Sequence, residues 1–249
     1  DVLHKNMSGL EDASTVPRFT WSELNILLEL CLTQHLYNLG IQVLKLLARW
    51  IQDRESETWW DENDDDAEFD ERREVVLASL PYSIQAEARV KPHNVPIDIQ
   101  YKLGALRLGL NQKDEAMVHF NALRKEENVQ DLFWDAGALL ESKGFYNEAL
   151  QFLEQFDNLD IQLDEEAEQQ LIPLLGKCYQ EVGNYIKAME CFRRVSRWKP
   201  DDKENRLALA EVLYHMGDRE ASKDILNAIS SLDTNPQILE IDSTVQPED

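Results

Sequence analysis

The sequence predicts an all-α solenoid, a right-handed superhelix of antiparallel helix pairs. The first observation behind this prediction is the unit at residues 169–202, where small and large apolar residues alternate at the spacing of two short helices. The second is that the small residues of this unit recur along the chain at intervals of 34, 39 and 33 residues. Helix pairs that repeat in this way bury their apolar faces against their neighbours, so we expect a stack of repeats.

The unit at 169–202 contains the features that let two helices pair. Gly176 and Ala188 are small, so two antiparallel helices approach each other closely at these positions. Gly183 opens the turn between the helices, and Pro200 ends the unit because it cannot continue a helix. Three aromatic side chains are expected to fill the space between the helices, namely Tyr179, Tyr185 and Phe192.

Three further registers carry the same kinds of residue. In chain order the equivalent positions are Gly104 and Ala116, then Ala136, Gly137, Gly144 and Ala149, and finally Leu209, Ala210, Gly217 and Leu226. The connection before the 169–202 unit is longer by five residues, and Pro173 falls inside the first helix of that unit. Because proline removes a backbone hydrogen bond at a cost of about 3 kcal/mol, we expect a kink there or a helix that starts afresh near Ile172.

The chain divides into repeats and interruptions. A loose apolar pattern from Trp21 onward indicates a degenerate repeat, and four clearer repeats follow the prolines Pro92 and Pro96. The chain also starts without Met, and we expect a fragment of a longer protein. The predicted organisation is a polar lead-in or end of a preceding repeat at 1–20, a degenerate repeat at 21–52, an acidic insertion at 53–71, a helical linker at 72–96, repeats at 97–129, 130–163, 169–202 and 203–236, and a frayed tail at 237–249.

The acidic insertion holds eleven acidic residues and one basic residue, Arg54. Self-repulsion at this density predicts a disordered loop. A second interpretation is that its aromatic residues dock on a basic, apolar groove of a partner or fold back on the repeats. A calcium loop is excluded because Asp66 stands where glycine is required and Arg72 where glutamate is required. The candidate interaction residues are Trp59, Trp60, Asp61, Asp64, Asp65, Asp66 and Phe69.

Charge and cysteine content narrow the class of function. The 249-residue chain has a net charge of -23, which disfavours nucleic-acid binding by the whole surface and suits either basic partners or simple solubility. Three cysteines form no CxxC pair, and buried thiols are expected at Cys178 and Cys191, in keeping with a reducing compartment. No run of 18 apolar residues is present, so we expect no membrane partner.

The sequence shows no catalytic constellation, and we expect no enzyme activity, cofactor or metal. It has no glycine-rich phosphate loop, no HExxH and no GxSxG motif. The five histidines are scattered, and His119 is expected on a helix surface beside the core residue Phe120.

A stack of helix pairs offers a concave groove lined by the first helix of each pair, and such grooves bind peptides or helices of other proteins. Trp134 and Tyr214 are the most attractive candidates because large aromatic residues dominate binding energy, although Trp134 could instead pack on a neighbouring repeat. The predicted groove residues are Tyr101, Leu108, Trp134, Glu141, Lys177, Gln180, Glu181, Glu211, Tyr214 and His215.

A basic patch interrupts the acidic background on the second helix of the 169–202 unit. It is either a solvated surface or a contact for an acidic segment, such as the Asp61–Glu71 run elsewhere in an assembly, or for a DNA phosphate. Its members are Lys187, Arg193, Arg194, Arg197 and Lys199.

The 169–202 unit closely resembles the tetratricopeptide repeat (TPR), with Ile172 where that family prefers tryptophan. The stretch 95–104, VPIDIQYKLG, together with 111–120 and 133–156, is similar to the TPR subunits of general transcription factor IIIC, which serves RNA polymerase III. This resemblance implies a nuclear scaffold of protein subunits that helps to assemble factor IIIC, recruits factor IIIB to tRNA-type promoters and meets DNA only through the complex. A TPR adaptor in another assembly, such as a ubiquitin ligase or an RNA-processing complex, and a nucleic-acid contact through the basic patch remain as alternatives.

Overall fold

Paired helices make up most of the chain in the computed structural model, which describes residues 19–62, 64–126, 129–158 and 165–233. Within these ranges the regular secondary structure is α-helix and short 3-10 helix, without strands. The predicted all-α fold class is therefore confirmed. None of the helices in these ranges combines the length and apolar character that a bilayer crossing requires. The predicted tail at 237–249 and most of the predicted lead-in at 1–20 lie outside the described residues.

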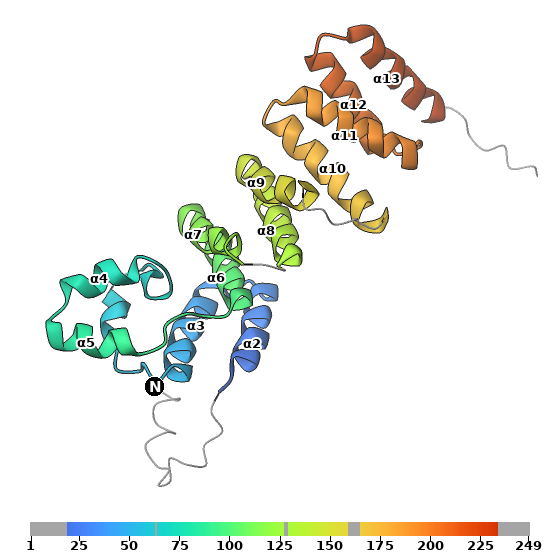
Figure 1. Cartoon of the computed structure of the whole chain (residues 1–249). Helices are drawn as coiled ribbons and strands as arrows, with labels where there is room; N and C mark the ends of the chain where they lie inside the picture. The colour runs from blue at the N-terminus through green and yellow to red at the C-terminus, as the bar shows by residue number, and fades with distance from the viewer. Residues whose placement is uncertain (1–18, 63, 127–128, 159–164, 234–249) are drawn as a thin grey trace, which may run out of the picture. The chain divides into compact units, whose positions relative to one another are not determined.

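The chain divides into two compact units, Asp1–Ala136 and Gly137–Asp249, and the boundary falls inside α8 (Gln130–Ser142). In the first unit, α2 (Trp21–Thr33) packs against α3 (Tyr37–Ile51), and α6 (Ile97–Gly109) packs against α7 (Lys113–Leu123) (Figure 1). Because α6 also packs against α2 and α3, the two pairs share one apolar core. Buried members of this core include Leu24, Leu28, Leu44, Ile99, Leu103 and Leu106.

The second unit contains the remaining helix pairs. α10 (Glu165–Glu181) packs against α11 (Tyr185–Trp198), and α12 (Lys203–His215) packs against α13 (Arg219–Asp233) (Figure 1). α11 also packs against α12, which joins the two pairs. α9 (Tyr146–Asn158) precedes them and packs against α10.

Side-chain caps mark the starts of several helices. At the start of α2 the hydroxyl of Thr20 accepts a hydrogen bond from the backbone N–H of Glu23, and the Glu23 carboxylate accepts one from the N–H of Thr20. This reciprocal arrangement satisfies two donors that the first turn of a helix leaves unpaired. Asp202 caps α12 by accepting the N–H of Asn205 at 3.0 Å.

The glycine pattern has the structural basis that the sequence predicts. A Cβ atom on Gly176 would lie 2.8 Å from Cε1 of Phe192, so only glycine allows α10 and α11 to approach this closely. Gly183 adopts a φ of +79°, a conformation that glycine takes at little cost. The contact role recurs at Gly104 and Gly137, and the positive-φ role recurs at Gly144 and Gly217.

α10 runs without interruption from Glu165 to Glu181 and therefore passes through Pro173. The predicted fresh start near Ile172 is wrong. The helix starts at Glu165 instead, where acidic residues in the first turn complement the helix dipole. Burial of Leu171 and Leu175 on either side holds the helix in place although one backbone hydrogen bond is missing.

The acidic insertion is folded, which corrects the prediction of a disordered loop. It forms two 3-10 helices, η1 (Thr58–Glu62) and η2 (Ala67–Phe69), and is followed by α4 (Arg73–Ser79) and α5 (Tyr82–Val90) (Figure 1). Of its aromatic residues, Trp60 and Phe69 are buried and Trp59 is partly buried. Trp60 packs in a small core with Ala67, Leu77 and Ala88, whereas Phe69 joins the core of α2, α3 and α6.

The carboxylates of the insertion are neutralised by its own Arg54 and by basic residues from other parts of the first unit. Arg49 of α3 binds Glu68 through two hydrogen bonds of 2.7 and 2.8 Å. Arg54 donates to Glu57 at 2.9 Å, and Arg73 of α4 lies 3.4 Å from the same carboxylate. The charge count that predicted disorder covered the insertion alone and therefore left out Arg49 and Arg73. Folding back on the repeats, the second interpretation from the sequence, is what the structure shows.

Candidate partner-binding surfaces

The predicted groove residues of the second unit include several that form linked contacts. Lys177 of α10 forms an ion pair with Glu141 of α8, and the hydrogen bond that its ammonium donates to this carboxylate raises the pKa of Lys177. Three residues further along α10, the side-chain amide of Gln180 donates to Glu211 of α12 at 2.9 Å. Glu181 is exposed at the end of α10. The first helices of successive repeats thus present connected polar side chains.

An aromatic cluster lies at the end of α12. The ring of His215 stacks on Tyr185 of α11 at 5.0 Å with an interplanar angle of 6°. Tyr214 meets His215 edge-on at 5.9 Å, and the guanidinium of Arg219 lies 5.7 Å from the centre of the Tyr214 ring. Tyr214 is nevertheless 55% exposed, which leaves much of its surface available to a partner. We call Tyr185, Tyr214, His215 and Arg219 the aromatic cluster.

The sequence identified only half of this cluster. The sequence predicts Tyr214 and His215 at the groove and Tyr185 in the space between α10 and α11, and it gives no signal for Arg219. Tyr185 is only partly buried. The intervals of 29 and 30 residues from Tyr185 to the other two aromatic residues give no local periodicity by which to group them.

Three predicted groove residues lie in the first unit. Leu108 is fully buried in α6, so its assignment to the groove is wrong. Tyr101 is partly buried and packs against Phe120 with ring centres 5.9 Å apart. Burial raises the pKa of Tyr101, and the nearby carboxylates of Asp135 and Glu29 add to this effect. Trp134 is partly buried on α8, and its role in binding stays a prediction.

The basic patch lies on exposed positions of α11 and its C-terminal cap. Lys187 forms an ion pair with Glu154 of α9 at 2.9 Å, and Arg194 pairs with Glu168 of α10. Contact between this patch and the Asp61–Glu71 run stays a prediction, although many carboxylates of that run already have basic partners within the first unit. Its partners there include Arg49, Arg107, Arg72 and Lys125.

Asp66 is the centre of the contacts between the acidic insertion and the repeats. Its carboxylate accepts two hydrogen bonds of 2.7 Å from Arg107, one at each oxygen, and lies 3.2 Å from the ammonium of Lys45. Nε2 of His119 lies 3.0 Å from the same carboxylate, and Nδ1 of His119 lies 2.8 Å from the side-chain amide of Gln100. His119 is completely buried, so the prediction that it lies on a helix surface is wrong.

The protonation of Asp66 follows from this environment. Burial by itself would raise the pKa of the carboxyl group, but hydrogen bonds from Arg107 and His119 and the charge of Lys45 outweigh burial. The pKa of Asp66 therefore lies well below its ordinary value. The carboxylate is ionised at neutral pH and serves as a permanent anion among cationic side chains.

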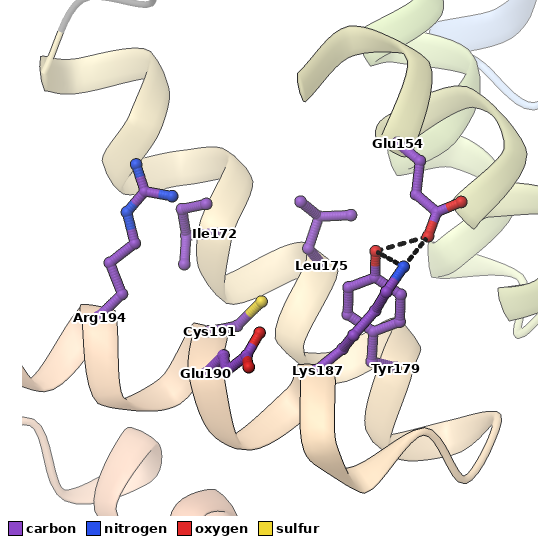
Figure 2. A pocket seen from close by; sticks show the side chains of 8 residues that line it. All are labelled: Glu154, Ile172, Leu175, Tyr179, Lys187, Glu190, Cys191 and Arg194. Carbon is purple, nitrogen blue, oxygen red and sulfur yellow. Dashed lines mark hydrogen bonds and ion pairs between the residues drawn. The ribbon is translucent and has the colours of Figure 1, made fainter. Parts of the chain in front are cut away.

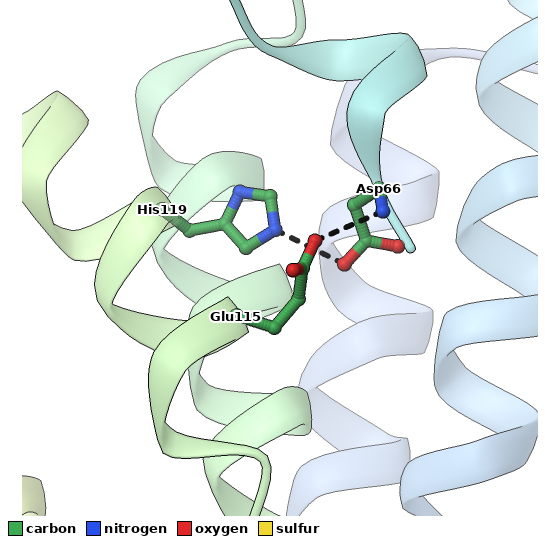
Figure 3. A group of neighbouring side chains, drawn as sticks. All are labelled: Asp66, Glu115 and His119. Atoms are coloured by element: carbon green, nitrogen blue, oxygen red, sulfur yellow. Dashed lines mark hydrogen bonds and ion pairs between the residues drawn. The ribbon is translucent and has the colours of Figure 1, made fainter. Parts of the chain in front are cut away.

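Asp66, Glu115 and His119 resemble a metal-binding triad, since their ligand atoms lie within 4.8 Å of one another (Figure 3). However, Glu115 accepts the backbone N–H of Asp66 at 3.0 Å and a hydrogen bond from Arg72 at 2.9 Å. A metal ion would have to displace arginine contacts from both carboxylates. We therefore assign the cluster to the anchoring of the acidic insertion.

Comparison with known proteins agrees with the repeat architecture. Residues 179–241 match the family described as tetratricopeptide repeat. Among solved structures, "MamA 41-end from Desulfovibrio magneticus RS-1" has a TM-score of 0.53 at 16% identity and covers 87% of this chain and 97% of its own. A "putative kinesin light chain" with TPR-like repeats, from Podosopora anserina, has a TM-score of 0.50 at 13% identity and covers 86% of this chain and 97% of its own. These structures support the fold alone.

Two curated relatives are transcription-factor subunits. The "Transcription factor tau 131 kDa subunit" of Saccharomyces cerevisiae is 39% identical over 211 residues, which is 84% of this chain and 20% of that protein. The "Transcription factor tau subunit sfc4" of Schizosaccharomyces pombe is 29% identical over 223 residues, covering 85% and 21%. The chain thus spans about a fifth of the length of these relatives.

Proposed function

We propose that this chain, which carries tetratricopeptide repeats and is related in sequence to the tau subunits, is part of a non-catalytic scaffold that assembles the RNA polymerase III initiation machinery. In this role it acts within a factor IIIC subunit, recruits factor IIIB and reaches DNA through the complex. The observation that carries the proposal is 39% identity over 84% of the chain to the tau 131 kDa subunit. The proposal implies a nuclear location.

The surfaces described above support binding to protein rather than catalysis. The aromatic cluster provides three rings and a guanidinium, and the hydrogen bond from Gln180 to Glu211 lies nearby on α10 and α12. Together these side chains suit a peptide or helix that lies across α10 and α12. Aromatic and arginine side chains at an exposed surface are the residue types that supply most of the energy in protein interfaces.

Affinity capture tests this proposal. The purified chain is immobilised and incubated with nuclear extract, and bound proteins are identified by mass spectrometry. The matched control carries Tyr214→Ala and Arg219→Ala. We expect subunits of factor IIIB or IIIC to be captured by the native chain and depleted by the control. Recovery of neither factor, or recovery of ubiquitin-ligase or RNA-processing subunits instead, would contradict the assignment in favour of another TPR adaptor.

A nucleic-acid contact through the basic patch is the second candidate, supported by the exposure of Arg193, Arg197 and Lys199. Charge reversal at Arg193, Arg194 and Arg197 should then abolish retention on immobilised duplex DNA. Retention that is unchanged by these reversals dismisses the patch as a DNA contact.

A further inference from the structure

A pocket of about 340 Å³ lies between α9 and α11 and has α10 as its floor (Figure 2). It is separate from the aromatic cluster and contains two members of the basic patch. α10 packs against both α9 and α11, and the ion pair between Glu154 of α9 and Lys187 of α11 spans the space above it. The lining residues are Glu154, Ile172, Leu175, Tyr179, Lys187, Glu190, Cys191 and Arg194.

The floor of the pocket is apolar. Ile172 and Leu175 come from α10 and are each 2% exposed, and Tyr179 follows one turn later. Cys191 adds a partly exposed thiol from α11. An apolar floor of this kind suits one aliphatic or aromatic side chain, because burying such a side chain contributes roughly 1.5–3 kcal/mol.

One wall of the pocket is a stripe along α11. Lys187, Cys191 and Arg194 are spaced four and three residues apart, so they share one face of the helix and all point to the pocket (Figure 2). The stripe therefore has a cation at each end and a thiol between them, and Glu190 adds one carboxylate to the same wall.

Contacts within the second unit hold both cations in place. The ammonium of Lys187 lies 2.9 Å from Glu154 and 4.8 Å from the centre of the Tyr179 ring, and the Tyr179 hydroxyl donates to the same carboxylate at 2.6 Å. At the other end Arg194 pairs with Glu168 and lies 5.7 Å from the centre of the Trp198 ring.

Both cations nevertheless keep donors for a partner. The Lys187 side chain is 50% exposed and the Arg194 side chain is 46% exposed. An ammonium has three donors and a guanidinium has five, and the contacts described above use only part of them. The two cations are thus held in place and still have unused hydrogen-bond donors.

We propose that this pocket is a docking site for an acidic amphipathic segment of another protein. The segment places one large apolar side chain on Ile172, Leu175 and Tyr179. Its carboxylates lie against Lys187 and Arg194, with Arg193 and Arg197 extending the positive surface along α11. Charge complementarity argues for this occupant, because the patch is a concentration of positive charge on a chain of net charge -23 and screening confines the interaction to nearby charges. The apolar floor argues for protein rather than nucleic acid.

Cys191 offers a direct measure of occupancy. Cys31 and Cys178 are buried, and burial raises the pKa of the Cys178 thiol to about 12, so both should react slowly with alkylating reagents. The rate of Cys191 alkylation by iodoacetamide, followed by mass spectrometry of the intact chain, therefore reports whether the pocket is covered. The probe is a short synthetic peptide that alternates glutamate with leucine.

We expect the Glu/Leu peptide to slow Cys191 alkylation by about tenfold at saturation, and paired Lys187→Gln and Arg194→Gln substitutions to weaken its apparent affinity by about tenfold. Lys223→Gln on α13 removes one positive charge elsewhere, as Arg194→Gln alone does at the pocket, and should have no effect. Circular dichroism melting verifies that each variant is folded, and Arg194→Gln alone is the milder variant if the pair does not fold.

Three results would overturn the proposal. They are unchanged alkylation at millimolar Glu/Leu peptide, equal protection by a Glu/Ser peptide that lacks apolar side chains, and equal protection by a short DNA duplex. The assay uses no transcription factor, so its outcome is independent of the capture experiment above.

Discussion

Arg107 holds Asp66 through two charge-assisted hydrogen bonds of 2.7 Å, one to each carboxylate oxygen, with both side chains almost completely excluded from solvent. Arg107 lies on α6 and Asp66 lies just before η2. This contact joins the acidic insertion to a repeat from which it is 41 residues distant in sequence. The insertion is therefore a fixed part of the first unit.

Removing the carboxylate should detach the insertion. Asp66→Asn leaves Arg107 and Lys45 without their buried counter-charge, and breaking a buried pair in this way costs about 3–5 kcal/mol. We expect the free energy of unfolding to fall by this amount and limited proteolysis to cut within residues 53–96. Asp64→Asn is the control: Asp64 also contacts Arg107, at 3.3 Å, but is 85% exposed, so its loss should cost less than about 1 kcal/mol. Equal effects of the two substitutions would contradict the anchoring role.

The stabilising effect of Asp66 should depend on pH. Because its pKa in the folded state is depressed, its contribution is complete above the unfolded-state pKa of about 4 and is lost progressively as the pH falls toward the folded-state value. Urea unfolding of the native chain and of Asp66→Asn from pH 7 down to pH 3 measures this. The stability difference between the two should be constant above about pH 5 and shrink below it. A stability difference that grows as the pH falls would contradict the expected direction of this pH dependence.

Gly176 should be intolerant of larger side chains. Its missing Cβ would lie 2.8 Å from Phe192 and 3.1 Å from the Cβ of Cys191, so Gly176→Val overpacks the contact between α10 and α11 at a cost of about 1–3 kcal/mol. Gly183→Ala provides the comparison: the new methyl group meets open space, and only the positive φ of 79° opposes it, at about 1–2 kcal/mol. Thermal melting of both variants measures these losses of stability. If Gly176→Val proves as stable as the native chain, the close approach of α10 and α11 is refuted.

Tyr214 should contribute to binding more than to folding. Since it is 55% exposed, Tyr214→Ala should leave the melting temperature nearly unchanged while weakening capture of the partner by about 2 kcal/mol, or roughly thirtyfold. Leu207→Ala on the same helix, at 48% exposure, is a matched control outside the aromatic cluster and should bind normally. If both substitutions weaken capture equally, the effect does not belong to the cluster.

The repeat pattern could be predicted because its causes are local. A close helix–helix contact requires glycine at Gly176, and a turn requires it at Gly183. Both requirements arise within one helix pair, so they recur with each repeat. The presence of the helices and the small residue at each helix–helix contact could therefore be predicted from residue spacing alone. The exposed faces were less predictable. Leu108 satisfies the same helical spacing as a groove residue, yet its burial depends on how α6 meets the other elements of the first unit.

The order of the acidic insertion could not be predicted because its counter-charges come from distant parts of the sequence. Arg107 binds Asp66 across 41 residues of sequence, and His119 contacts Asp66 across 53 residues. One local signal was present: Arg107 is the only charged residue between Leu103 and Leu110, in an otherwise apolar helical stretch. A buried arginine of this kind requires an anion, and the acidic insertion supplies it.

The most direct test of the proposed scaffold role is where the full-length protein lies on the genome. Chromatin immunoprecipitation of the tagged protein from its own cells, followed by sequencing, measures this. The account predicts enrichment at tRNA genes together with subunits of factor IIIB. Signal at tRNA genes no higher than at genes transcribed by RNA polymerase II would contradict it.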